Sequence, residues 1–319
     1  MALSGGVDSS FSLALSLERY GRARAGYVDV TGKGPAPAVI QVAEKLNVDL
    51  TVVSARRIFQ EEIARWSRLQ LKKGLTPNPC ARCNARVKLS LLHRELKDRE
   101  VLVTGHYVRR DGESLRRGAD SGKDQSYFLS MVNSEILNRC RFPLGEMKKD
   151  SVRKRAEELG IPFRRQESMD LCFELIRGGA EGRIVDTGGN TLGEHSGIGG
   201  FTVGQRKGLG ALGRKMYVVS IHPGSGTVVV GSRRDLLSSG CRITETNWLK
   251  DDLDFPDEFL VQTRYRRPPV RAVVDYGEDC FHIEYIEPEE AVAPGQVCAV
   301  YRDDILVGGG IITSTERLC

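Results

Sequence analysis

Apolar residues follow helical and strand-like spacing in turn over the first 140 positions. Stretches with one broad apolar face predict helices, and they are 9–20, 36–46, 57–72 and 86–96. Short apolar runs predict strands, at 24–30, 50–53 and 101–103. Since this alternation builds a parallel sheet with helices on both faces, we predict an α/β domain.

The pattern changes further along the chain. A charged helix is predicted over 148–159, ended by Gly160 and Pro162. From Ile184 onward glycines are dense and short alternating segments follow one another, which predicts an antiparallel β-barrel or sandwich. We therefore expect three parts: a catalytic α/β domain over 1–140, a small connecting domain over 141–206 and a β domain over 207–319.

Composition fits a globular protein, with 319 residues, 40% of them hydrophobic and 28% charged. No apolar run approaches the roughly 20 residues that cross a bilayer, and there is no secretory signal, so a cytoplasmic location is expected. The net charge of +5 is compatible with a polyanionic partner. Eight cysteines in a reducing compartment should be thiols whose spacing reflects chemistry or metal binding.

A glycine-rich turn, SGGVDSS at 4–10, stands between Met1-Ala2-Leu3 and the first predicted helix. The first strand is therefore very short, or the chain lacks its beginning. The glycines permit a tight turn, and the helix N-terminus offers N–H donors to an anion. Asp8 could cap the helix or help hold Mg²⁺. No lysine follows, unlike the GxxxxGK[ST] loop of nucleotide hydrolases. A plain strand-to-helix turn remains the alternative.

Two cysteines, Cys80 and Cys83, stand three residues apart in TPNPCARCN at 76–84, before the helix predicted to start near Arg86. A helix N-terminus and nearby cationic side chains favour reactive thiolates. A zinc half-site is the alternative, although no second C-x-x-C or histidine pair accompanies it. A third cysteine, Cys172, is remote. The remaining cysteines are expected to be ordinary thiols: Cys140, Cys241, Cys280, Cys298 and Cys319.

The loop resembles the pyrophosphatase loop of enzymes that adenylate their substrates with ATP, which include GMP, NAD and argininosuccinate synthetases and tRNA thiolases. Several longer segments resemble the bacterial tRNA-specific 2-thiouridylases almost end to end. They include the loop at 4–10, TPNPCARCN at 76–84, VTGHYVR at 103–109, GKDQSYFLS at 122–130, FPLGEMKK at 142–149, ESMDLCF at 167–173, FTVGQRKGLG at 201–210, TRYRRPPV at 263–270, APGQ at 293–296 and GGGII at 308–312. The resemblance implies an adenine-nucleotide α-hydrolase-like parallel-sheet domain, a small central domain and a C-terminal antiparallel β-barrel.

The resemblance also implies roles for single residues. Cys83 matches the family's nucleophile and Cys172 the cysteine that carries a persulfide, with Asp8 as a further catalytic residue. Positions matching the ATP site are Ala2, Leu3, Ser4, Gly5, Gly6, Val7, Asp8, Ser9, Asp29 and Gly105. Positions matching tRNA contacts are Asn78, Pro79, Cys80, His106, Lys123, Asp124, Gln125, Arg264, Tyr265 and Gln296. His106 could instead satisfy a core hydrogen bond, and 123–125 could be a solvated turn.

The sequence departs from the family pattern in three places. The segments 31–37 and 173–186 are short, and Cys80 stands where some members have aspartate. Without that carboxylate, acid–base help at this position must come from elsewhere or from the thiol.

The activity that the resemblance implies is ATP-dependent 2-thiolation of the wobble uridine in a tRNA anticodon stem-loop, with Mg²⁺. Sulfur would come from a persulfide on Cys172, supplied by a sulfur-relay protein or a cysteine desulfurase. The alternative sulfur source is a [4Fe–4S] cluster held by Cys80, Cys83 and Cys172. Two other classes remain open: an amidating synthetase, which would share the loop but need an ammonia supply, and a non-enzymatic RNA-binding protein, which would leave the loop and the paired cysteines unexplained.

Overall fold

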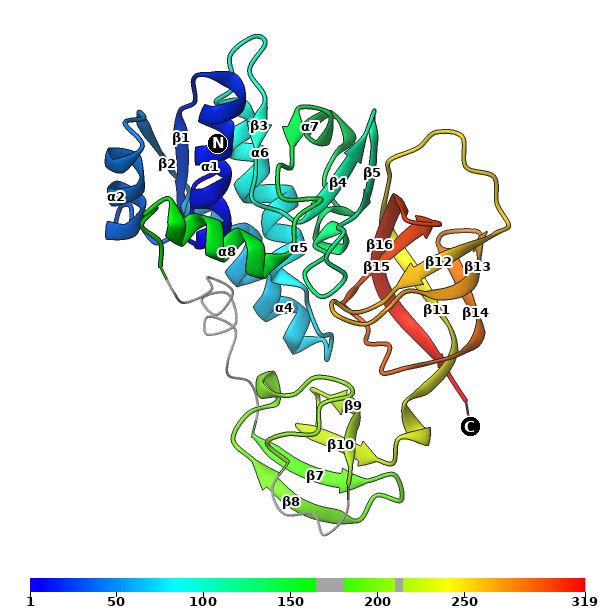
Figure 1. Cartoon of the computed structure of the whole chain (residues 1–319). Helices are drawn as coiled ribbons and strands as arrows, with labels where there is room; N and C mark the ends of the chain where they lie inside the picture. The colour runs from blue at the N-terminus through cyan, green and yellow to red at the C-terminus, as the bar shows by residue number, and fades with distance from the viewer. Residues whose placement is uncertain (165–180, 210–214, 319) are drawn as a thin grey trace. The chain divides into compact units, whose positions relative to one another are not determined.

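The computed structural model describes residues 1–164, 181–209 and 215–318 (Figure 1). The chain forms two compact units, each built from separate stretches of sequence. The first unit comprises Met1–Ile63, Cys80–Leu171 and Asp304–Val307, and the second comprises Ala64–Pro79, Cys172–Asp303 and Gly308–Cys319. In the described residues, no helix combines the length and apolar character of a membrane span. Cys172, the residue predicted to carry the persulfide, lies outside the described residues.

Parallel strands form the centre of the first unit. Strand β1 (Ala25–Asp29) pairs in parallel with β2 (Leu50–Ser54), and β3 (Leu102–Val103) pairs in parallel with β6 (Cys140–Arg141). Residues 1–3 bridge the two pairs, because the Gly26 amide donates to the Met1 carbonyl (2.8 Å) and the Ala2 amide donates to the Val103 carbonyl (2.9 Å). Residues 1–3 form an isolated parallel bridge, Ala2 with Gly26, between the two pairs.

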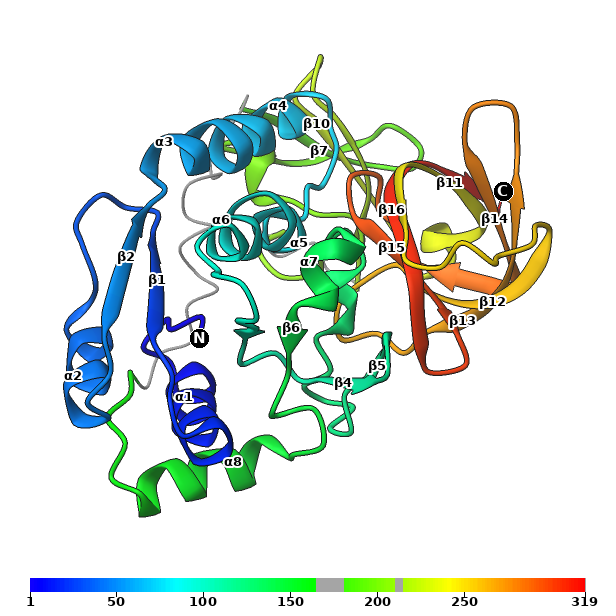
Figure 2. The ribbon, with the colours of Figure 1, turned by 90° about the horizontal axis from the view of Figure 1, so that it is seen from above.

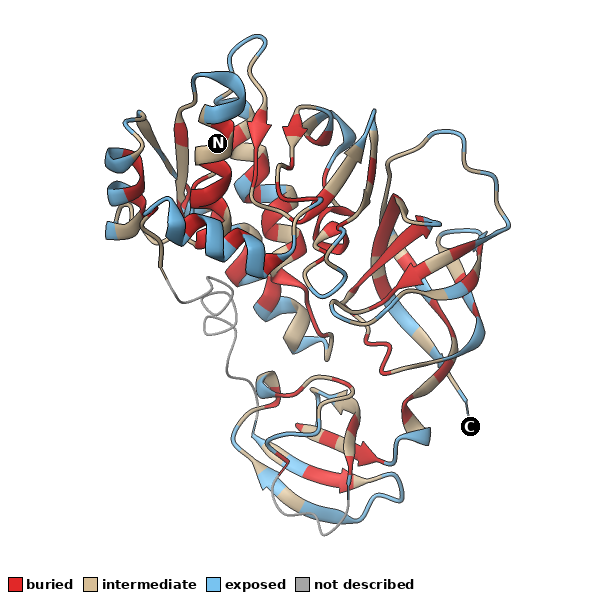
Figure 3. Cartoon of the chain, in the orientation of Figure 1, coloured by how far each residue is buried: buried red, intermediate tan, exposed pale blue. Residues whose placement is uncertain are grey.

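Helices cover this sheet through the apolar faces that the sequence predicted. Helix α1 (Val7–Tyr20) packs against α8 (Lys149–Glu158), with Phe11 and Val152 fully buried between them (Figure 2). Helix α2 (Pro37–Lys45) places Val39 and Val42 in the core of the sheet. Buried residues accordingly run along α1 (Figure 3).

Two of the predicted helices differ from the expectation. The stretch predicted as one helix over 57–72 comprises α3 (Arg56–Phe59), a π-helical segment (Gln60–Arg65) and α4 (Trp66–Lys72). The helix predicted near Arg86 begins seven residues earlier, as α5 (Pro79–Cys83), a π-helical segment (Asn84–Lys88) and α6 (Leu89–Arg94). Proline lacks the N–H that a first helical turn leaves unpaired, so Pro79 can start the helix. Cys80 and Cys83 thus lie within the helix and not before it.

A polar hairpin of the first unit escaped prediction. Strands β4 (Val108–Asp111) and β5 (Ser114–Arg117) pair with each other, and β5 also pairs with Ile305 and Leu306. The short helical turns at Ser126–Leu129 and α7 (Ser134–Asn138) follow it.

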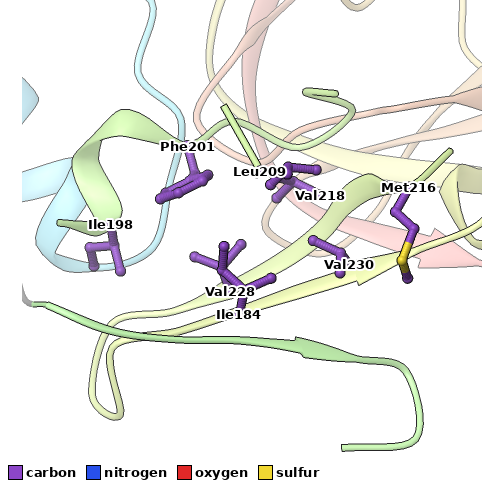
Figure 4. Packing of buried hydrophobic residues seen from close by; sticks show 8 residues of the cluster. All are labelled: Ile184, Ile198, Phe201, Leu209, Met216, Val218, Val228 and Val230. Atoms are coloured by element: carbon purple, nitrogen blue, oxygen red, sulfur yellow. The ribbon is translucent and has the colours of Figure 1, made fainter. Parts of the chain in front are cut away.

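The second unit contains two sheets. The smaller has the order β8 (Thr191–His195), β7 (Gly182–Asp186), β10 (Thr227–Gly231) and β9 (Tyr217–His222). Strands β7 and β10 are parallel and the other pairs antiparallel. Ile184, Phe201, Val218 and Val228 belong to the buried cluster that holds this sheet together (Figure 4).

The larger sheet is the C-terminal barrel. Its strands are β11 (Leu237–Trp248), β12 (Asp257–Gln262), β13 (Val270–Tyr276), β14 (Phe281–Glu290), β15 (Val297–Arg302) and β16 (Ile305–Arg317). Strand β11 pairs antiparallel with both β14 and β16, which closes the sheet on itself. The structure therefore confirms the α/β fold with a C-terminal antiparallel barrel. The three predicted domain ranges stay predictions.

Candidate functional site

The glycine-rich loop closes over the first turn of α1. Gly5 has a φ of +76°, a left-handed conformation that favours glycine. The Ser9 hydroxyl accepts the Ser4 amide (3.1 Å) and donates to the Gly6 carbonyl (2.9 Å). These bonds fix the loop at the helix N-terminus, where unpaired N–H groups and the helix dipole attract an anion.

Gly105 lies directly beside this helix start. A Cβ on Gly105 would lie 2.9 Å from the Ser9 amide nitrogen and 2.9 Å from the Asp8 carbonyl carbon. Glycine therefore allows the backbone at 105 to pack directly against the first turn of α1, where a larger residue would clash. The structure brings Gly105 together with the loop, as the family resemblance implied for the nucleotide site.

Asp29 stands at the end of β1 and is buried. Its carboxylate accepts the Gly34 amide (2.8 Å), the Gly32 amide (2.8 Å) and both the amide and the hydroxyl of Thr31 (3.0 and 2.9 Å). Burial by itself raises the pKa of Asp29, but these hydrogen bonds outweigh it and hold the pKa below its usual value. Asp29 thereby organises the turn that follows β1.

A buried lysine that the sequence analysis did not single out reaches the loop. Lys149 Nζ lies 2.7 Å from Asp8 Oδ1 and 2.6 Å from Asp8 Oδ2, and the Tyr107 hydroxyl donates to Asp8 Oδ1 at 2.8 Å. Only 10% of the Lys149 side chain is exposed, so pairing with a carboxylate offsets the cost of burying the ammonium. Helix α8 thus supplies a lysine to the glycine-rich loop, whose own sequence at 4–10 contains none. The charged pattern of 148–159 is typical of a solvated helix and gave no signal of this contact.

One of the predicted tRNA contacts, Gln125, supports Tyr107, and the neighbouring Asp124 holds the turn in place. Gln125 Oε1 accepts the Tyr107 amide (3.1 Å), and the Gln125 amide donates to the Tyr107 carbonyl (3.1 Å). The buried Asp124 carboxylate accepts Arg117 Nε at 2.8 Å and two backbone amides. Lys123 lies half-buried in the same turn. These contacts join the turn to the loop through Tyr107.

The predicted nucleophile lies within the helix that starts at Pro79. Cys83 is 1% exposed, and Cys80, one turn earlier, is half-buried. Asn84, next to Cys83, faces His106, with Asn84 Nδ2 3.4 Å from the imidazole Nε2. The structure therefore brings the cysteine helix and the segment after β3 together.

His106 is held on both ring nitrogens. Its Nδ1 lies 2.9 Å from the Thr104 hydroxyl oxygen, opposite the Asn84 contact. Burial, with a smaller contribution from Lys88, lowers the pKa of His106 to about 4. The imidazole is therefore neutral at physiological pH.

Metal ligands are sparse in the described part of the chain. Within residues 1–164, 181–209 and 215–318, no three His, Cys, Asp or Glu side chains are grouped to hold a metal ion. The predicted cluster would take Cys80 and Cys83 from the described residues and Cys172 from outside them.

The predicted tRNA residues of the second unit hold loops in place. Gln296 Nε2 donates to the Thr76 carbonyl (2.9 Å) and the Pro77 carbonyl (3.3 Å), and Asn78 Nδ2 lies 3.4 Å from Gln296 Oε1. The TPNP segment, including the buried Pro79, is thereby attached to the turn before β15.

The basic cluster of the second unit lies in the turn after β12. Arg264 Nη1 donates to the Val203 carbonyl (3.3 Å), and the Arg266 guanidinium lies 5.6 Å from the centre of the Tyr265 ring. Tyr265 is half-buried and Arg266 is exposed. An exposed cation beside an aromatic ring is suited to contacts with phosphate and base.

Comparison with known proteins covers nearly the whole chain. Family models match residues 1–175 (tRNA methyl transferase HUP domain), 174–232 (tRNA methyl transferase PRC-barrel domain) and 238–312 (aminomethyltransferase beta-barrel domain). A tRNA-specific 2-thiouridylase MnmA of Nitratidesulfovibrio vulgaris (strain DP4) is 38% identical over 338 residues, covering 98% of this chain and 97% of the relative. Proteins of the same name from a Synechococcus strain and Treponema denticola are 37% and 36% identical, covering 99% and 100% of this chain and 97% and 98% of theirs.

Proposed function

The chain belongs to the tRNA-specific 2-thiouridylase family, and we propose that it uses ATP to replace the C2 oxygen of the wobble uridine of a tRNA with sulfur. The observation that carries the proposal is the anion site at the start of α1. There the first amides of α1, which have no partner within the helix, lie beside the Ser9 hydroxyl and the Asp8–Lys149 ion pair, and the Gly105 backbone packs closely against the same turn.

In the first step, the uridine C2 oxygen attacks the α-phosphorus of ATP and pyrophosphate leaves. The amides of α1 and the ammonium of Lys149 offset the negative charge that builds up on the leaving group. Mg²⁺, with Asp8 as the carboxylate that the loop offers, would add positive charge to the phosphates. The product is a uridine activated at C2 by an adenylate.

In the second step, the terminal sulfur of a persulfide on Cys172 attacks C2 and AMP leaves. The Cys83 thiolate then attacks the Cys172 sulfur, which breaks the S–S bond, releases the thiolated uridine and leaves a Cys83–Cys172 disulfide for a cellular thiol to reduce.

The alternative route delivers sulfide from a [4Fe–4S] cluster. Cys80 and Cys83, three residues apart on one helix, would be two of its thiolate ligands and Cys172 the third. Substitution of Cys80 separates the routes, because the persulfide route does not need this thiol. We expect Cys80→Ala to thiolate tRNA aerobically from a persulfide donor without bound iron. Loss of both iron and thiolation, measured after anaerobic purification, would establish the cluster instead.

The function itself is tested by ATP–pyrophosphate exchange. Exchange should require tRNA, and a complete reaction should yield AMP and 2-thiouridine detectable by mass spectrometry of tRNA digests. An amidating synthetase would give exchange without tRNA, and an RNA-binding protein would give none. We propose tRNA and a sulfur-donor protein as partners in the cytoplasm.

A further inference from the structure

One end of the C-terminal barrel carries a group of touching aromatic rings. Trp248 ends β11, Phe255 lies in the loop that follows, and Phe281 begins β14. The ring centres of Trp248 and Phe281 are 4.9 Å apart, those of Phe255 and Phe281 are 4.9 Å apart, and those of Trp248 and Phe255 are 5.1 Å apart. Tyr276, at the end of β13, lies 4.9 Å from Phe281 and is 62% exposed. We call these four residues the aromatic cluster.

Acidic side chains surround the aromatic cluster. They lie in the loop between Trp248 and Phe255 and at the tip of the β13–β14 hairpin, and all are exposed. This acidic rim consists of Asp251, Asp252, Asp254, Asp275, Glu278 and Asp279. Among the described residues none of the six forms an ion pair, whereas neighbouring Asp257 and Glu258 are neutralised by Arg302 and Arg271. Lys250 is the one cation within these two segments.

The sign of this surface is opposite to that of the whole chain, whose net charge is +5. A polyanion such as tRNA binds through lysine and arginine, so the acidic rim repels it. ATP is a polyanion as well. Of the macromolecules that the proposed reaction brings together, the sulfur-delivering protein is the one that is not a polyanion, so its surface can carry the positive charge that fits here.

We propose that the aromatic cluster and the acidic rim form the docking surface for the sulfur-delivering protein, and that this protein presents a basic face with an apolar contact for Tyr276. This inference rests on the proposed function, in which sulfur arrives on a protein persulfide. Tyrosine is one of the residue types enriched among the few side chains that contribute most of the binding energy of an interface. The Phe281 ring holds Tyr276 in place, so little side-chain entropy is lost on docking.

The test compares two sulfur sources for the same enzyme. One is a desalted extract of the source organism lacking its own copy of this enzyme, supplied with ³⁵S-cysteine, so that sulfur must arrive on proteins. The other is sodium sulfide, whose HS⁻ attacks the adenylated C2 directly and displaces AMP, so that neither docking nor a Cys172 persulfide is needed. The variants are Tyr276→Ala and the double variant Glu278→Lys/Asp279→Lys. Glu287→Lys is the matched control, because it changes an exposed acid on β14 outside the rim.

Tyr276→Ala and the double variant should each lose about tenfold or more of the extract-dependent ³⁵S incorporation into tRNA, which corresponds to about 1.4 kcal/mol of binding. Their sulfide-dependent thiolation should stay within about twofold of the parent, as should both activities of Glu287→Lys. Unchanged extract-dependent activity in Tyr276→Ala and in the double variant would overturn the proposal, and so would an equal loss with both donors. If the parent enzyme thiolates tRNA with neither donor, the proposed function itself fails.

Discussion

At the residue scale, the contact between Lys149 and Asp8 joins side chains 141 positions apart. The loop could be recognised from sequence because glycine, serine and aspartate at close spacing have a local physical meaning. Lys149 could not be recognised in this way. Its position depends on how α8 packs on α1, and the charged helix around it is typical of solvated surface.

Replacing Lys149 should disable the adenylation step. Lys149→Met keeps the length of the side chain and removes its charge, so we expect tRNA-dependent pyrophosphate release to fall by roughly 10²–10³-fold, the usual effect of losing one stabilising group. Lys148→Met is the matched control, because Lys148 is exposed at the start of the same helix. Pyrophosphate release at the parental rate in Lys149→Met would rule out this role.

Because the pKa of His106 is lowered in the folded protein, the free energy of unfolding should decrease in mild acid. Its pKa in the folded state, about 4, lies below the ordinary value of 6.5. Between these values the unfolded chain binds a proton that the folded protein does not, so stability falls as the pH drops from 6.5 towards 4, by on the order of 2 kcal/mol.

Urea unfolding at pH 7 and pH 4.5 measures this effect. His106→Gln should show a smaller loss of stability between the two pH values than the parent. Taking the difference removes the contributions of carboxylates such as Asp29, whose lowered pKa also reduces stability in acid. His222→Gln, at an exposed histidine, should behave like the parent. Identical pH dependence in His106→Gln and the parent would contradict the assignment.

At the element scale, the strongly periodic helices and the barrel could be predicted, but their ends could not. The helix that carries the cysteines starts at Pro79 because proline suits a first turn, whereas the apolar spacing becomes visible only further along. The hairpin of β4 and β5 was missed because its residues are mostly charged. Its arginines are ordered by long-range ion pairs, Arg116 with Asp304 at 2.7 Å among them, that no local pattern reveals.

Substitution of Gly105 by alanine tests how closely the segment after β3 approaches the start of α1. Gly105→Ala would put a Cβ 2.9 Å from the backbone of Asp8 and Ser9, closer than side chains normally come. The helix start must shift or become covered, so we expect ATP affinity to fall by about tenfold or more. Gly224→Ala, where a Cβ meets nothing within 4 Å, is the control. Equilibrium binding of ATP measures both, and equal affinities would show that the helix start is not the phosphate site.

At the scale of the whole molecule, charge is distributed unevenly. A net charge of +5 coexists with an acidic rim at one end of the barrel, so the remainder of the chain is more basic than the total indicates. Composition reveals only the total. The separation of the two signs emerges once the loop after β11 and the β13–β14 hairpin are brought together by the contact of Phe255 with Phe281.

The separation of the acidic rim from the basic remainder of the chain predicts how tRNA affinity responds to salt concentration. Affinity should fall steeply as salt rises, because each phosphate contact releases bound counterions. Arg264→Ala should lower the slope of log affinity against log salt by about one, the value for one lost phosphate contact. Glu278→Lys/Asp279→Lys should leave the slope unchanged, because the rim lies outside the proposed RNA path. Fluorescence titrations with tRNA from about 50 to 200 mM salt would measure both slopes.

A steeper slope in the double variant would mean that RNA passes over the rim. An unchanged slope in Arg264→Ala would remove the turn after β12 from the tRNA surface.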